Sequence, residues 1–115
     1  MSISTHVLDA NSGLPAAGVE VRLTVRVEGA GSAEVGWRDV AHSHTDADGR
    51  IAQLAAGQDA GRYRISFDTG AYYTGLGIET FYPEVSVVFD IVDPSRHHHV
   101  PLLLSPFAYS TYRGS

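Results

Sequence analysis

Alternation of hydrophobic and polar residues is the clearest pattern in the chain. From Val19 to Val27 every second residue is apolar, and charged residues and one threonine fill the positions between. Residues Arg62–Asp68 alternate in the same way, with Tyr63 and Phe67 among those on the apolar side. A period of two predicts strands that bury one face and expose the other.

The remaining strands are predicted on both sides of these two. They are expected at Ser4–Asp9, Gly36–Thr45, Glu84–Val92, His97–Ser105 and Ala108–Arg113. Glu84–Val92 is rich in apolar residues, so we expect it to be more buried than the alternating strands. Clusters of Gly, Pro, Asn, Asp and Ser separate the segments, and Gly29–Gly36 is predicted to be a hairpin loop.

One short helix completes the prediction. Only Thr69–Gly77 is suited to it, and the glycines there limit it to two or three turns. Short strands at near-regular spacing predict an all-β sandwich or barrel. The length of 115 residues fits a single domain, 1–115.

Composition narrows the function classes. A net charge of −5 argues against a nucleic-acid partner, and no apolar stretch is long enough to span a membrane. The chain has no cysteine, which excludes disulfides and a thiol nucleophile. We find no signal peptide in the first residues and expect a cytoplasmic protein.

Histidines are the first candidates for chemistry. His6 lies within the first predicted strand, where a lone histidine is more often a packed or surface residue than a catalyst. His97 and His99 share one strand face, and His98 points to the other with Val100. Two imidazoles at this spacing suit one shared ligand, and they also suit a zinc ion.

Arg50 and Tyr112 are the other candidates. Arg50 follows an Asp-Gly turn and opens a strand, and Tyr112 lies in the closing segment Tyr112–Ser115. A solvated charge and an edge-strand aromatic are the simpler interpretations. No phosphate-binding glycine loop, G-x-S-x-G or H-E-x-x-H motif is present. The remaining candidates would supply a general base from the histidines, a cationic anchor from Arg50 and a phenol donor from Tyr112.

Several long motifs give a specific resemblance. The segments STHVLDANSGLPAAGVEVRL, TDADGRI and HVPLLLSPFAYSTYRGS closely resemble those of the transthyretin-related 5-hydroxyisourate hydrolase family, in the same order along the whole chain. The ending YRGS is typical of the hydrolases and is lost in true transthyretins.

The resemblance implies both fold and activity. The fold would be a transthyretin-like two-sheet antiparallel sandwich of about eight strands with one short helix. The chain would form a homotetramer, a dimer of dimers. It would hydrolyse 5-hydroxyisourate to 2-oxo-4-hydroxy-4-carboxy-5-ureidoimidazoline in urate degradation, with no metal and no cofactor.

The resemblance also implies the site. The matching catalytic positions are His6, Arg50, His99, Tyr112 and Ser115, and His97 would join His6, Arg50 and Tyr112 in binding substrate. His6 and His99 would together activate water, Arg50 would hold substrate oxygens, and Ser115 would orient a histidine. The family usually has Tyr where this chain has His98, and we expect His98 to point away from the site.

Three other interpretations stay open at this point. A transthyretin-like carrier of a small ligand would share the fold, and a zinc-binding protein would use His6, His97 and His99. A structural adhesion-type sandwich would explain the fold but not the ending.

Overall fold

The computed structural model describes residues 2–28 and 35–114. In chain order the elements are β1 (Ser2–Asp9), β2 (Leu14–Pro15), β3 (Glu20–Glu28), β4 (Val35–His44), β5 (Arg50–Ala56), β6 (Gly61–Phe67), α1 (Thr69–Gly75), β7 (Val85–Ile91), β8 (His98–Ser105) and β9 (Ala108–Thr111). Every predicted strand and the predicted helix are therefore present. The predicted hairpin loop at Gly29–Gly36 lies largely outside the described residues.

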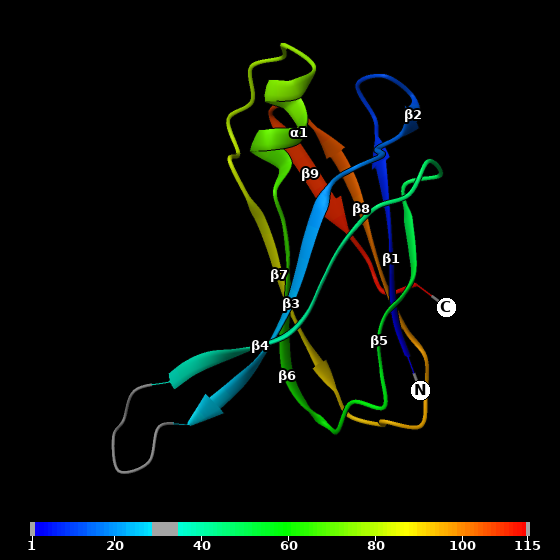
Figure 1. Ribbon diagram of the computed structural model, residues 1–115, viewed down its shortest axis with the longest axis vertical. Helices are drawn as coiled ribbons and strands as arrows, with labels where there is room; N and C mark the ends of the chain where they lie inside the picture. Colours follow the sequence, from blue (N-terminus) through cyan, green and yellow to red (C-terminus); the bar gives the residue numbers. More distant parts are fainter. Residues whose placement is uncertain (1, 29–34, 115) are drawn as a thin grey trace.

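The strands form two sheets (Figure 1). One has the order β2-β1-β8-β9, with β5 also pairing with β1, and the other has the order β4-β3-β6-β7. This confirms the two-sheet, all-β fold class. Nine strands are described instead of about eight, and the two-residue β2 is a piece the sequence analysis assigned to a turn.

One strand pair departs from the antiparallel expectation. β1 and β8 run parallel, from Ile3 opposite His98 to Asp9 opposite Leu104. A parallel pair needs a long crossover between its strands. Here the crossover contains the entire second sheet, so the pairing joins segments about ninety residues apart and is not visible in any local pattern.

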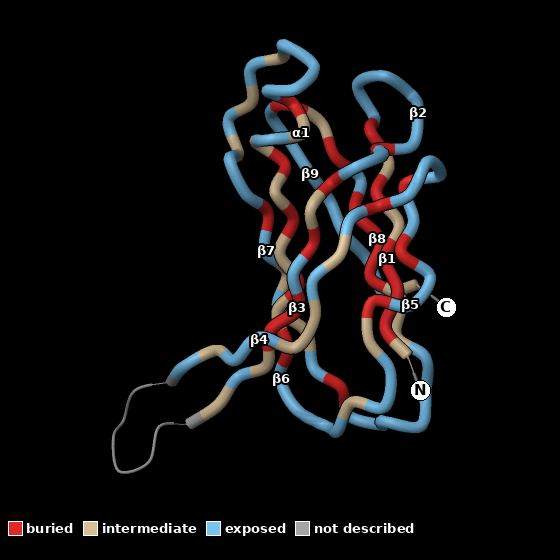
Figure 2. The backbone as a smooth tube through the Cα atoms, viewed as in Figure 1, coloured by how far each residue is buried: buried red, intermediate tan, exposed pale blue. Residues whose placement is uncertain are grey.

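The core lies between the two sheets (Figure 2). Inward-facing residues of the central strands are fully buried, including Val7 on β1, Leu23 on β3, Ile65 on β6 and Leu102 on β8. The alternation predicted at Arg62–Asp68 is confirmed, since Tyr63, Ile65 and Phe67 are all buried. Burial of apolar side chains is the main stabilising term of such a fold.

The strand β7 is less buried than expected. Val88 is 53% exposed, so the prediction that Glu84–Val92 would be the more buried strand is wrong. The reason is its place: β7 is the edge strand of its sheet. Period two turns Val88 outward with Ser86, and on the inner side Phe89 is half-buried because β7 has a neighbour on one side only.

The helix α1 covers one end of the sandwich (Figure 1). Asp68 caps it by accepting a hydrogen bond from the Ala71 backbone N–H at 3.2 Å. Gly70 is needed because a Cβ there would meet the Pro83 carbonyl oxygen at 2.7 Å. Within the described residues, no helix is long and apolar enough to cross a membrane.

A buried carboxylate ties this helix to β1. Asp9 is 1% exposed. The hydroxyl of Tyr72 donates to its Oδ2 at 2.9 Å, and that of Tyr73 donates to its Oδ1 at 3.1 Å. Burial first, and then the bond and charge of Asp9, raise the pKa of Tyr72 to about 12. The same causes raise the pKa of Tyr73 further.

This arrangement predicts loss of stability at alkaline pH. A phenol whose pKa is raised by folding stabilises the folded state fully below its ordinary pKa of about 10 and loses that effect as the pH approaches the folded value. The free energy of unfolding should fall between pH 10 and about 12, and Tyr72→Phe should make the fall shallower. Urea unfolding followed from pH 8 to pH 12 measures both slopes. Equal slopes in the two proteins would contradict this assignment to Tyr72.

Candidate functional site

The outward face of the five-stranded sheet gathers the candidate residues. On β1 the inward residues are Ile3, Thr5 and Val7, so Ser4 and His6 face outward. The ladders place His6 opposite Arg50 on β5 and Ser4 opposite His99 on β8. Residues paired across a ladder share one face of a sheet. These four side chains, those of Ser4, His6, Arg50 and His99, therefore lie on one surface.

A tight turn positions Arg50. Asp46 Oδ1 accepts hydrogen bonds from the backbone N–H of Asp48 at 2.9 Å and of Arg50 at 3.0 Å. Gly49 has φ +73°, and a Cβ at this position would collide with the carbonyl oxygen of Val7. Only glycine fits there. The Asp-Gly-Arg sequence thus brings Arg50 alongside His6.

The same turn orients His6. Its Nε2 lies 3.0 Å from the carbonyl oxygen of Asp48. A carbonyl only accepts, so Nε2 carries the proton in this contact. In the neutral ring Nδ1 is then unprotonated, and His6 has a lone pair available to act as a base.

Serine hydroxyls link the two histidines of the H-x-H motif. Ser4 Oγ lies 2.8 Å from His97 Nε2 and 2.7 Å from His99 Nδ1. Ser2 Oγ lies 2.6 Å from His97 Nδ1. The imidazole rings of His97 and His99 stack with centroids 6.5 Å apart, which confirms that they share one face. Ser2, His97, Ser4 and His99 form a continuous hydrogen-bonded chain.

This chain has two proton arrangements. A hydroxyl donates one proton, so Ser4 donates to one histidine and accepts from the other when both rings are neutral. When Ser4 donates to His97, His99 Nδ1 carries a proton and His99 Nε2 is left with a free lone pair. When Ser4 donates to His99, the assignment reverses.

The surroundings favour the neutral form of His99. Burial lowers its pKa most, followed by electrostatic repulsion from His97, His6 and Arg50. His99 is thus uncharged at neutral pH, as a general base requires.

The C-terminal segment packs onto His99. The Gly114 backbone N–H donates to the His99 carbonyl at 2.9 Å. A Cβ at Gly114 would collide with the His99 ring, approaching Cγ to 2.9 Å. The glycine of the YRGS ending is therefore required where the chain crosses the imidazole. Ser115 lies outside the described residues, so its expected role stays a prediction.

An open cavity of about 840 Å³ adjoins the histidines. Its lining includes His97, His99 and Tyr112, together with Val87 and Phe89 of β7. It thus brings Tyr112 beside the two histidines of the motif. Neither His6 nor Arg50 is among the lining residues.

His98 is paired with the inward residue Ile3 and so projects from the other face of β8, but it also lines the open cavity beside His97, His99 and Tyr112, so the expectation that it points away from the site is only partly met. It lines a small pocket with Ile3 and Ile91, and burial lowers its pKa. A histidine in place of the usual Tyr therefore changes the packing beneath the sheet and also one wall of the open cavity.

The zinc alternative at His6, His97 and His99 receives no geometric support. Among the described residues, the one group of three metal-ligating side chains whose ligand atoms converge is Glu20, His42 and His44. That group lies on the other sheet. None of these three residues was predicted from the sequence to form a site, and neither were Ser2, Ser4 or Gly114. The serines were detectable as polar residues on the outward face of β1, two positions apart and leading to His6.

The sequence of this chain also matches known proteins. A model of the family described as HIUase/Transthyretin matches residues 3–114. The chain belongs to this family. The 5-hydroxyisourate hydrolase of Salmonella dublin is 45% identical over 115 residues, covering 98% of this chain and 80% of that protein.

Solved structures of the HIUase/Transthyretin family show the same fold. That of Klebsiella pneumoniae 5-hydroxyisourate hydrolase has a TM-score of 0.84 at 37% identity, covering 100% of both chains. Sea bream transthyretin in complex with thyroxine has a TM-score of 0.88, also at 37% identity, covering 99% of this chain and 95% of that chain. The fold alone thus does not separate hydrolase from carrier.

The contact between Gly114 and His99 yields a second prediction. Gly114→Ala should move the His99 ring or lift the C-terminal segment from β8, because the added methyl group and the ring need the same space. The imidazole resonances of His99 in an NMR spectrum of the folded protein report either change. Gly75→Ala is the matched control, since a Cβ there has no atom within 4 Å. An unshifted His99 resonance in Gly114→Ala would contradict the packing argument.

Proposed function

We propose that this chain hydrolyses the lactam bond of 5-hydroxyisourate, giving 2-oxo-4-hydroxy-4-carboxy-5-ureidoimidazoline. The observation that carries the proposal is the outward face of the five-stranded sheet, where His6 and Arg50 pair across one ladder and Ser4 and His99 across the next. The Salmonella dublin relative is named for this reaction. The chain is accordingly an enzyme, a cyclic amide hydrolase.

The residues fit the steps of lactam hydrolysis. Water must lose a proton as it attacks the carbonyl carbon, and the developing oxyanion needs a positive partner. The neutral His99 accepts the proton, and the Nδ1 lone pair of His6 is placed for the same purpose or for passing the proton to the leaving nitrogen. Arg50 holds substrate oxygens with a charge that is not lost at any working pH. Tyr112 adds a phenol at the cavity.

The hydroxyl chain suggests where the proton goes. In the starting arrangement Ser4 donates to His97, and the lone pair on His99 Nε2 faces substrate. When His99 takes the water proton at Nε2, its Nδ1 proton passes to Ser4, whose own proton moves to His97. Positive charge then lies on His97, near Ser2 and farther from the reacting carbonyl. Ser4 is a positioning residue here, because it acts through the histidines.

The carrier alternative rests on the sea bream structure, which holds thyroxine in the same fold. A carrier requires a ligand-sized cavity but no base. A carrier does not need the guanidinium of Arg50 or the hydroxyl of Ser4 near His99, so their presence favours the hydrolase.

We also propose a homotetramer, a dimer of dimers. Supporting it, β7 and β9 are edge strands, and all four residues of β9 are exposed. Exposed edges are usually covered, and pairing with a second copy is one way to cover them. A neighbouring copy would enclose the open cavity at Tyr112. A cytoplasmic location and a single domain spanning 1–115 also remain predictions.

The function is tested by following hydroxyisourate decay. Urate oxidase generates the substrate in the cuvette, and ultraviolet absorbance reports its loss with this protein and a chelator present. We expect faster decay than in buffer, and a fall in turnover of about 10²–10⁴-fold in His6→Ala or His99→Ala, the usual contribution of a positioned base. His44→Ala, on the other sheet, is the matched control. No acceleration by the folded wild-type protein would favour the carrier, which thyroxine binding would then reveal.

Ser4→Ala tests the hydroxyl chain separately. It breaks the link between His97 and His99, so we expect kcat to fall about tenfold with little change in KM, and the solvent deuterium isotope effect on kcat to shrink, as for a proton-transfer contribution at the low end of the usual range. Ser4→Thr restores a hydroxyl and should recover both values. If Ser4→Ala matches the wild type in kcat and isotope effect, the proton does not travel through Ser4.

A further inference from the structure

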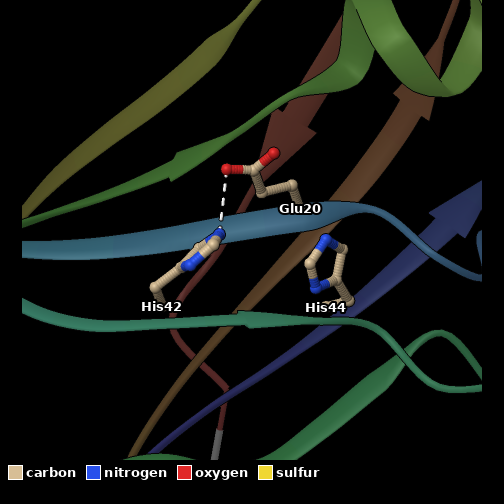
Figure 3. A group of neighbouring side chains, drawn as sticks. All are labelled: Glu20, His42 and His44. Carbon is tan, nitrogen blue, oxygen red and sulfur yellow. Dashed lines mark hydrogen bonds and ion pairs between the residues drawn. The ribbon is translucent and has the colours of Figure 1, made fainter.

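A second polar cluster lies on the outer face of the four-stranded sheet. It consists of Glu20 on β3 and His42 and His44 on β4 (Figure 3). Each offers one ligand atom, and the three atoms lie within 4.8 Å of one another. The core separates this face from the one that carries His6 and His99, so the two clusters are distinct.

The ladder between β3 and β4 holds the cluster together. Glu20 is the direct cross-strand partner of His44, and Arg22 is that of His42. His42 and His44 are two positions apart and so project from the same face of β4, with ring centroids 5.5 Å apart. Their positions depend on the backbone ladder and not on flexible loops.

A hydrogen bond already joins two of the three groups. His42 Nε2 lies 2.9 Å from Glu20 Oε1 (Figure 3). The carboxylate only accepts, so the ring nitrogen donates its proton. A metal ion that replaced this proton would bind the same two atoms. Neither Glu20 Oε2 nor the ring of His44 takes part in this hydrogen bond.

The local charge is mixed. Arg22 Nη2 lies 3.2 Å from the same Glu20 Oε1. Arg22 first, and then His42, hold the pKa of Glu20 below its usual value, so the carboxylate is ionised at neutral pH. Glu20 also lines a cavity of about 470 Å³ together with Asp68 and Glu84. Three acidic residues and one arginine, Arg22, are thus among its lining residues.

We propose that Glu20, His42 and His44 form a binding site for a divalent transition metal, of which zinc is the best fit. Two imidazoles and one carboxylate are borderline ligands that suit zinc, whereas calcium and magnesium require six or more oxygens. Water would complete the tetrahedron. The proposal does not depend on the hydrolase activity.

Binding requires modest rearrangement. Zinc holds nitrogen and oxygen ligands at about 2.0–2.2 Å, which places neighbouring ligand atoms of a tetrahedron about 3.3 Å apart. The ligand atoms, now within 4.8 Å of one another, must close slightly. Arg22 must also leave Glu20 Oε1, and its side chain is 55% exposed and free to turn into solvent. Arg22 therefore weakens the site without blocking it.

Calorimetric titration with zinc chloride tests the proposal. The full chain carrying His97→Ala and His99→Ala serves as background, so that imidazoles of the catalytic face do not contribute. We expect one zinc per chain in this background. Adding His44→Ala or Glu20→Gln should weaken binding about tenfold or more, since even outer partners of metal ligands are worth about 10–100-fold. Arg22→Gln should tighten it.

Control variants make the outcome decisive. His98→Ala removes an imidazole outside the cluster and should leave zinc affinity unchanged. Hydrolase activity of the single variant His44→Ala in the otherwise wild-type chain should also be unchanged, which separates this test from that of the proposed function. Absence of zinc binding in the background, or equal affinity with and without His44 and Glu20, would overturn the proposal.

Discussion

The parallel ladder between β1 and β8 is the constraint on which the proposed catalytic face, the outward face that carries His6 and His99, depends. It places Ser4 beside His99 and, one pair further, Thr5 beside Val100. Because side chains alternate between faces, a slip of one residue would turn His99 toward the core and expose residues such as Leu102. The register that forms the hydrogen-bonded chain of Ser2, His97, Ser4 and His99 is therefore the same register that buries the core. A change in one would disrupt the other.

Threonine hydroxyls on the two neighbouring strands reinforce this register. Thr5 Oγ1 donates to the Val100 carbonyl at 2.7 Å, and Thr111 Oγ1 donates to the Pro101 carbonyl at 2.7 Å. Thr5 is buried, so its bond also satisfies a hydroxyl that would be costly to leave unpaired. Thr111 is exposed on β9, and its bond fixes the other side of β8. Stability and site geometry therefore rest on the same strands.

The sequence predicted what depends on local pattern. Alternation located the strands, and the spacing of His97 and His99 correctly placed both on one face. The parallel partner of β1 could not be predicted from pattern, because it follows an entire intervening sheet. Ser4 and Gly114 were not predicted, because their importance comes from contacts with His99. Ser4 lies far from His99 along the chain, so no local pattern indicates that contact. The low burial of β7 was missed because apolar content does not reveal an edge strand.

The two outer faces show why imidazoles alone do not define a function. On the five-stranded sheet a serine hydroxyl joins His97 and His99, and a hydroxyl can reverse its donor direction, which is what the proposed proton transfer requires. On the four-stranded sheet the carboxylate of Glu20 accepts a hydrogen bond from His42 and lies near His44. An ionised carboxylate donates nothing, so it attracts and holds a cation. The group beside the histidines, rather than the histidines themselves, separates the proposed proton transfer on one face from the proposed metal binding on the other.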